Sequence, residues 1–175
     1  MMNWLRNSRV AAGLLTVLRL YVGWKFISAG WGKLTNDKPF DASGFMKGAI
    51  AKADGEKPVV QQWYGDFLQG FTLPNVDVFN FLVPWGEFLV GLTLITGTLT
   101  MFSAFMGIFM NFNFLFAGAI SLNPNLILIQ FFLLAAGMNA GRFGGDYWII
   151  PWVRKYARAL YRNEQSSAPS RTTNS

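Results

Sequence analysis

The sequence contains no cysteine and no histidine among its 175 residues. Without cysteine there are no disulfides, no thiol redox chemistry and no cysteine-ligated iron–sulfur clusters. Without histidine there is no histidine-ligated haem, no histidine-dependent zinc site and no Ser-His catalysis. We therefore expect no metal site, no haem, no iron–sulfur cluster and no zinc. Any redox role must use a bound organic cofactor or a partner's metal.

Charged residues are also scarce, at 14% of the chain, whereas soluble domains carry about a quarter. Hydrophobic residues make up 52%, and phenylalanine alone occurs 17 times. This apolar excess suits a surface that faces lipid. The formal net charge is +6, but the basic residues flank apolar stretches. They indicate membrane topology rather than a groove for nucleic acid, and we expect no nucleic-acid partner.

Four apolar segments approach the roughly 20 residues that a membrane helix needs. They cover about residues 10–33, 78–99, 101–122 and 125–139. The charge of Arg19 inside the first segment argues that it is kept as a helix rather than cleaved as a signal peptide. Short junctions make the last three segments antiparallel neighbours. The sequence thus predicts an all-α polytopic membrane protein, a four-transmembrane-helix bundle formed by one domain over residues 1–162.

The basic residues predict the orientation of this bundle, because cytoplasmic flanks are enriched in lysine and arginine. They lie before the first segment and after the fourth: Arg6, Arg9, Arg142, Arg154, Lys155, Arg158 and Arg162. Four spans bring both flanks to one side. We expect a multi-pass protein of the plasma membrane with both termini in the cytoplasm and the loop 34–77 outside.

Two regions outside the spans have amphipathic patterns typical of interfacial helices. In the outer loop, Asp41 can cap a helix that ends at Ala53, and Pro58 can begin a second helix that reaches Phe71. These helices would form either a simple cover or a docking surface. At the other end, Asp146 can cap a cytoplasmic interfacial helix over residues 147–162. Residues 163–175 are rich in Ser and Thr and are predicted to be disordered.

Ionisable groups inside a bilayer are costly and indicate function. At about 1.5 Å of rise per residue, Arg19 and Glu87 both lie roughly 14 Å from their membrane edges, near the midplane. We therefore expect them to form a pair. Asn113 and Asn111 lie at a similar depth, although their side chains diverge, so that only one is expected to join.

The expected pair has two interpretations. It can be a structural clamp that fixes helix register, or it can also hold a ligand. A quinone headgroup would suit arginine and asparagine as donors and glutamate as a proton acceptor. Under the second interpretation Glu87 and Arg19 are the catalytic candidates. The quinone-binding candidates are Arg19, Glu87, Asn111, Asn113, Lys25 and Lys33; the two lysines can equally serve the membrane interface.

Several short motifs resemble the DoxX/DoxD family of small membrane proteins. They are Leu18-Arg19-Leu20, Gly30-Trp31-Gly32-Lys33-Leu34, Pro84-Trp85-Gly86-Glu87-Phe88 and Gly141-Arg142-Phe143-Gly144-Gly145-Asp146. The resemblance implies a four-helix bundle. The long outer loop is more similar to the DoxD branch, whose members are membrane subunits of thiosulfate:quinone oxidoreductase. Such subunits act beside a second subunit, which this chain does not contain as a fused domain.

Three functional hypotheses follow. The first is a quinone-interacting membrane subunit of an oxidoreductase system, of which the thiosulfate:quinone type is one form. The second is a non-catalytic membrane scaffold that recruits a partner enzyme. The third, a small-molecule carrier, is less favoured because the ends of the spans are mostly apolar. The expected partners are the lipid bilayer, a second oxidoreductase subunit and further copies of the chain as a homo-oligomer.

Overall fold

The computed structural model describes residues 1–167, with side chains up to residue 156. This part of the chain is helical and contains no strand, which confirms the all-α prediction. The helices in chain order are α1 (Met2–Asn7), α2 (Arg9–Thr35), α3 (Ser43–Ala53), α4 (Gln62–Phe67), the π-helical turn η1 (Leu68–Thr72), α5 (Val76–Thr96), α6 (Thr100–Phe116), α7 (Asn123–Ala136), the 3₁₀ turn η2 (Gly137–Gly141) and α8 (Asp146–Ser167).

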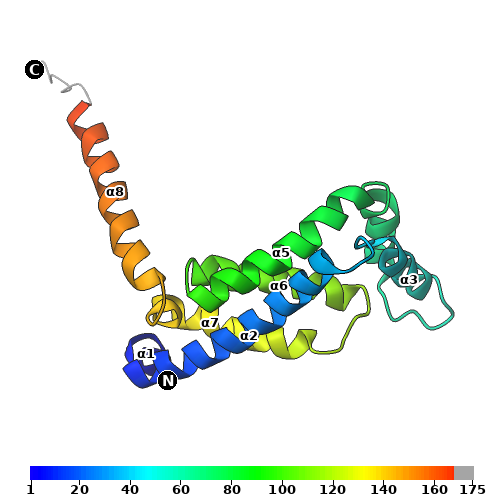
Figure 1. The fold of residues 1–175 in the computed structure, drawn as a ribbon, viewed down its shortest axis with the longest axis horizontal. Coiled ribbons are helices and arrows are strands. Elements are labelled where there is room, and N and C mark those ends of the chain that lie inside the picture. The colour runs from blue at the N-terminus through cyan, green and yellow to red at the C-terminus, as the bar shows by residue number, and fades with distance from the viewer. Residues whose placement is uncertain (168–175) are drawn as a thin grey trace, which may run out of the picture.

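The long apolar helices α2, α5, α6 and α7 lie alongside one another and form the body of the molecule (Figure 1). Helix α2 packs mainly on α5, and α6 packs mainly on α7. Three stretches are long and apolar enough to cross a membrane: Arg9–Thr35, Val76–Thr96 and Asn123–Gly141. Helix α6 is apolar but has only 17 residues, or about 26 Å of rise. The chain is a membrane protein.

The third and fourth apolar segments differ from their predicted bounds. Helix α6 ends at Phe116 rather than near residue 122, because the chain turns through left-handed conformations at Gly118 and Ser121. The next helix then begins at Asn123 and continues through η2 to Gly141. The turn thus shortens the third helix and lengthens the fourth.

The loop between α2 and α5 forms a helical cap at one end of the bundle (Figure 1). Asp41 accepts a hydrogen bond from the backbone N–H of Ser43 (2.9 Å) as α3 begins. The second loop helix begins at Gln62 rather than at Pro58, and it changes to π-helical hydrogen bonding at Leu68. The cap has its own apolar core, made by Ala42, Met46, Ala49, Ala53, Val60, Tyr64, Leu68 and Ala117.

Both α1 and the start of α8 lie at the opposite end of the bundle, and α8 then extends sideways from it (Figure 1). Helix α8 reaches Ser167, so residues 163–167, predicted to be disordered, are helical. The first residue after Asp146–Ser167 that disfavours a helix strongly is Pro169. The rest of the predicted tail, 168–175, lies outside the described residues.

Candidate functional site

The close contact between α2 and α5 orients the acidic residue of the second span. A Cβ atom added at Gly91 would lie 2.7 Å from Ile27 Cα, and one added at Gly30 would lie 2.9 Å from Phe88 Cα. Small residues of this kind let two membrane helices bring their backbones together. The antiparallel register that results places residue 87 opposite residue 31, so that Glu87 faces the C-terminal half of α2.

Glu87 forms an ion pair with Lys33 across this contact. The Lys33 ammonium donates a hydrogen bond to Glu87 Oε2. The carboxylate is almost fully buried, with 5% of the side chain exposed, whereas 28% of the lysine side chain is exposed. The lysine nitrogen also lies 5.6 Å from the centre of the Phe40 ring, within cation–π range. The pair therefore connects a buried carboxylate with a partly exposed ammonium.

Lys33 lines a hollow of about 380 Å³ beside the helical cap. Asn36, Lys38, Phe40 and Asp41 also line this hollow. Hydrogen bonds from the Ser43 hydroxyl and backbone N–H lower the pKa of Asp41, which keeps it negatively charged. Because Glu87 neutralises Lys33, and Asp41 lines the hollow together with Lys38, the hollow is mixed in charge rather than strongly basic.

Aromatic side chains follow the same stretch of α2 and α5. The ring centres of Trp31 and Phe88 lie 5.9 Å apart, and those of Trp85 and Phe88 lie 6.1 Å apart. Both tryptophans are exposed on the outside of the bundle. Their position suits an interfacial aromatic belt.

A second polar pair lies between α6 and α7. Asn111 Nδ2 donates to Gln130 Oε1 at 2.9 Å, and both side chains are buried. The Gln130 Nε2 atom has no hydrogen-bond partner among the described residues. Contacts of Thr93 with Ser103 and of Gly86 with Met110 fix the register of α5 and α6. In that register Asn111 lies close to the level of Glu87.

The expected Arg19–Glu87 pair is wrong. The two Nη atoms of Arg19 donate to the carbonyl oxygens of Ala140 (3.3 Å) and Phe143 (2.9 Å), at the end of the bundle where α8 begins. A Cβ added at Gly97 would lie 2.6 Å from Arg19 Cζ. Because Glu87 is opposite residue 31, about 18 Å of helix rise separates the two levels.

Arg19 is instead the centre of a clasp that closes this end of the bundle. The Asp146 carboxylate accepts hydrogen bonds from the backbone N–H groups of Leu99 (2.7 Å) and Thr100 (2.9 Å). It therefore caps α6, whereas the sequence predicted that it would cap its own helix. Asp146 also attracts the buried Arg19 guanidinium electrostatically. The geometry is that of a structural lock, because chain atoms surround the guanidinium.

The other two predicted polar residues lie away from the ion pair. Asn113 lies near the end of α6 and contacts the helical cap, where the Tyr64 hydroxyl donates to its backbone oxygen (3.0 Å) and lies 3.2 Å from its Oδ1. Burial raises the pKa of Tyr64 to about 12. The nitrogen of Lys25 lies 5.6 Å from the centre of the Tyr21 ring.

The structure thus brings together two of the six predicted residues directly, Lys33 and Glu87, with Asn111 at a nearby level. Gln130 was not among the predicted site residues, although a glutamine inside an apolar segment was a visible signal. Among the side chains of residues 1–156, no group of three acidic residues gathers to hold a metal ion.

The DoxX family model matches residues 14–119, which contain Arg19, Lys33, Glu87, Asn111 and Asn113. The chain belongs to the DoxX family. No curated protein and no solved structure matches it significantly. The DoxX match covers most of α2, the helical cap, α5 and α6. It ends before α7, the helix that carries Gln130.

Proposed function

We propose that this DoxX protein is a quinone-interacting membrane subunit of an oxidoreductase system, and that Lys33 and Glu87 form its headgroup site. The observation that supports the proposal is the ion pair between facing membrane helices, with one partner buried and the other partly exposed in the hollow. Intramembrane ionisable residues mark functional sites by default. This site takes the place of the expected Arg19-based site at the midplane.

The residues of the hollow suit a neutral headgroup with carbonyl oxygens. The Lys33 ammonium has three N–H donors, and one of them is used by Glu87. A second can donate to a carbonyl oxygen, while the ring of Phe40 offers an apolar surface beside it. The mixed charge of Lys38 and Asp41 does not favour a small divalent anion such as thiosulfate.

A bound quinone supplies chemistry with two electrons and two protons. In this arrangement Lys33 would orient the headgroup, and Glu87 would hold a proton within the low-dielectric interior. Because the sequence has no cysteine and no histidine, we propose that a partner subunit provides the electrons. The thiosulfate:quinone type remains one form of this proposal.

The basic residues support a proposal for the orientation of the protein in the membrane. Arg6, Arg9, Arg142, Arg154 and Lys155 belong to α1, the start of α2, and the η2–α8 region at one end of the bundle. Lysine and arginine are enriched in the cytoplasmic segments of membrane proteins. We therefore infer that this end faces the cytoplasm and that the membrane is the plasma membrane. The hollow beside Lys33 would then open to the outside.

The test is mass spectrometry of quinones that co-purify with the protein in mild detergent. Wild type should carry quinone, and Lys33→Gln and Glu87→Gln should lose most of it. Lys25→Gln is the matched control, because it removes a lysine from the same helix that does not contact Glu87. Melting temperatures would verify that each variant is folded. If wild type carries no more quinone than the control lipid extract, the pair is structural and the scaffold hypothesis takes its place.

A further inference from the structure

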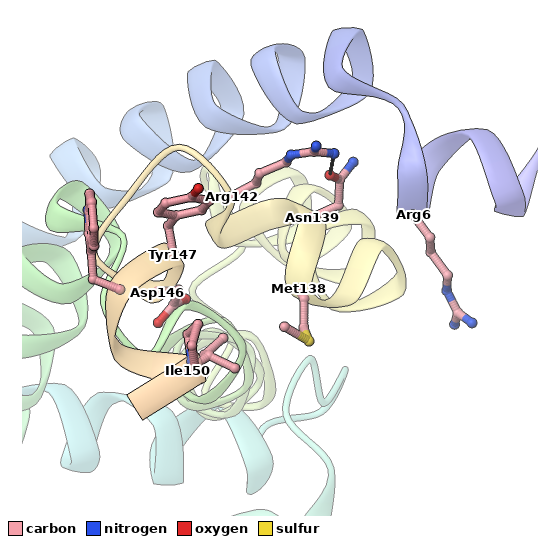
Figure 2. Close-up of a pocket in the computed structure, with 9 residues that line it drawn as sticks. Arg6, Met138, Asn139, Arg142, Asp146, Tyr147 and Ile150 are labelled. Atoms are coloured by element: carbon pink, nitrogen blue, oxygen red, sulfur yellow. Dashed lines mark hydrogen bonds between the residues drawn. The ribbon is translucent and has the colours of Figure 1, made fainter. Parts of the chain in front are cut away.

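A second hollow, of about 560 Å³, lies at the opposite end of the bundle from the Lys33–Glu87 pair. Its volume falls within the range of about 300–1,000 Å³ that small-molecule sites occupy. It is formed where α1, η2 and α8 meet, and Figure 2 shows Met138 and Arg6 on one side and Tyr147 and Ile150 of α8 on the other. The hollow therefore has an apolar wall and an arginine at its edge.

Arg6 lines this hollow, and Arg154 contacts Met138 in its wall; both arginines have weak or incomplete hydrogen bonding. Arg6 uses its Nε to donate to the Ala135 carbonyl (3.0 Å), and its side chain is exposed. Arg154 donates to the Met138 sulfur (2.8 Å), which is a weak acceptor. No other hydrogen bond joins the Arg154 side chain to the part of the chain that the structure describes. Both guanidinium groups are thus free to bind an anion, and guanidinium groups match phosphate oxygens well.

The charge of the acidic residue on the wall is balanced by a further arginine, because Asp146 attracts the buried Arg19 guanidinium. Both Asp146 oxygens accept backbone hydrogen bonds from the start of α6, and the side chain is buried. Arg142 is the second arginine of the lining, and its Nη1 donates to Asn7 O at 3.3 Å. The hollow is therefore electrostatically suited to an anion.

The apolar part of the lining identifies the kind of anion. Trp148 and Tyr147 are exposed aromatic residues at the first turn of α8, with Ile150 and Pro151 beside them. Tryptophan and tyrosine favour the level of lipid headgroups at a membrane surface. Helix α8 extends sideways from the ends of the spans, as an interfacial helix does (Figure 1). A soluble anion would not need this apolar wall, whereas a lipid with acyl chains would.

We propose that this hollow binds the phosphate headgroup of an anionic phospholipid. Arg6 and Arg154 contact the phosphate, Met138 and Ile150 contact the glycerol and the upper acyl chains, and Trp148 lies at the membrane surface. The bound lipid fastens α8 to the bundle, because its ligands come from both α1 and α8. This site is independent of the proposed quinone site.

Native mass spectrometry of the full chain in detergent tests the proposal, with phosphatidylglycerol and phosphatidylcholine as probes. Wild type should bind the anionic lipid selectively. Arg6→Gln and Arg154→Gln should each weaken this binding about fivefold, since a basic residue near anionic lipid contributes about 1 kcal/mol. Arg9→Gln is the matched control, because Arg9 is exposed near the same end, and its side chain neither lines the hollow nor hydrogen-bonds to a described residue that does.

Further measurements test the role of the arginine charge and whether the phosphate belongs to a lipid or to a soluble anion. Arg154→Lys should retain most of the lipid binding, whereas Arg154→Gln should not. Equal binding of both lipids, or equal loss in Arg9→Gln, would overturn the site. Displacement of the lipid by millimolar inorganic phosphate would also overturn it, because the hollow would then be a site for a soluble anion. Brominated phosphatidylglycerol should quench less fluorescence in Trp148→Phe than in wild type, and equal quenching would contradict the placement of Trp148.

Discussion

The Lys33 ammonium on α2 and the Glu87 carboxylate on α5 form an ion pair in the half of the bundle nearer the helical cap. The two partners differ in burial, since the carboxylate is enclosed and the lysine reaches the hollow beside the helical cap. Removal of either partner leaves the other in a different environment, and the two variants should therefore behave differently.

Lys33→Met should destabilise the protein more than Glu87→Gln. The first variant leaves a buried carboxylate without its partner, and breaking a buried pair in this way costs about 3–5 kcal/mol. The second leaves an ammonium that can turn toward water, at a cost of about 1 kcal/mol. Denaturant unfolding in detergent measures both losses, and the double variant should lose less than their sum. Equal and additive losses would contradict the pairing.

Gly91→Ala should separate α2 from α5. The added methyl group would lie 2.7 Å from Ile27 Cα, a backbone atom that cannot rotate away, and such overpacking costs about 1–3 kcal/mol. Gly13→Ala is the control on α2, because no atom lies within 4 Å of the added methyl. Alanine there should stabilise the helix by about 0.5–1 kcal/mol. Thermal melts should thus shift in opposite directions, and shifts of one sign would contradict the contact.

The sequence was sufficient to predict the all-α membrane fold, because long apolar runs leave few alternatives. It was also sufficient to identify Lys33 and Glu87 as candidates. It did not predict their pairing, because depth was counted from approximate span ends. Residues 137–146 fold back over Arg19, so the arginine lies at the end of the bundle rather than at its midplane.

Asp146 illustrates a second limit of the sequence. Its place at the start of α8 predicts a cap for that helix, but its carboxylate caps α6, which begins 46 residues earlier in the chain. A local pattern cannot reveal such a long-range contact. The same is true of Arg19, whose partners are backbone carbonyls more than 100 residues away.

Asp146→Ala should open the clasp at this end. It removes the acceptor for Leu99 N–H and Thr100 N–H and the negative charge near Arg19, at a cost of about 2 kcal/mol. Asp77→Ala is the control, because Asp77 is an exposed residue in the first turn of α5 and contributes about 0.5 kcal/mol. Hydrogen exchange should increase at the start of α6 only in the first variant. Unchanged exchange there would show that the cap is unimportant.

Alkaline pH should destabilise the helical cap, because it ionises the Tyr64 phenol. The neutral phenol is buried and donates to the Asn113 carbonyl, and burial raises its pKa to about 12. A raised pKa in the folded state means that the contribution to stability is full below about pH 10, the unfolded value, and is lost as the pH rises toward 12. Absorbance at 295 nm, as the difference between wild type and Tyr64→Phe, measures this titration. A difference curve centred near pH 10 would contradict the burial.

The measurement that tests the central claim most directly is photolabelling with an azido-quinone in reconstituted membranes, followed by peptide mapping. The account predicts labels on residues 29–41 and 84–88, which surround Lys33 and Glu87. It also predicts that Lys33→Gln and Glu87→Gln abolish these labels, while Lys25→Gln retains them. Labels spread evenly over the lipid-facing surfaces, and unchanged by Lys33→Gln and Glu87→Gln, would contradict a quinone site at this ion pair.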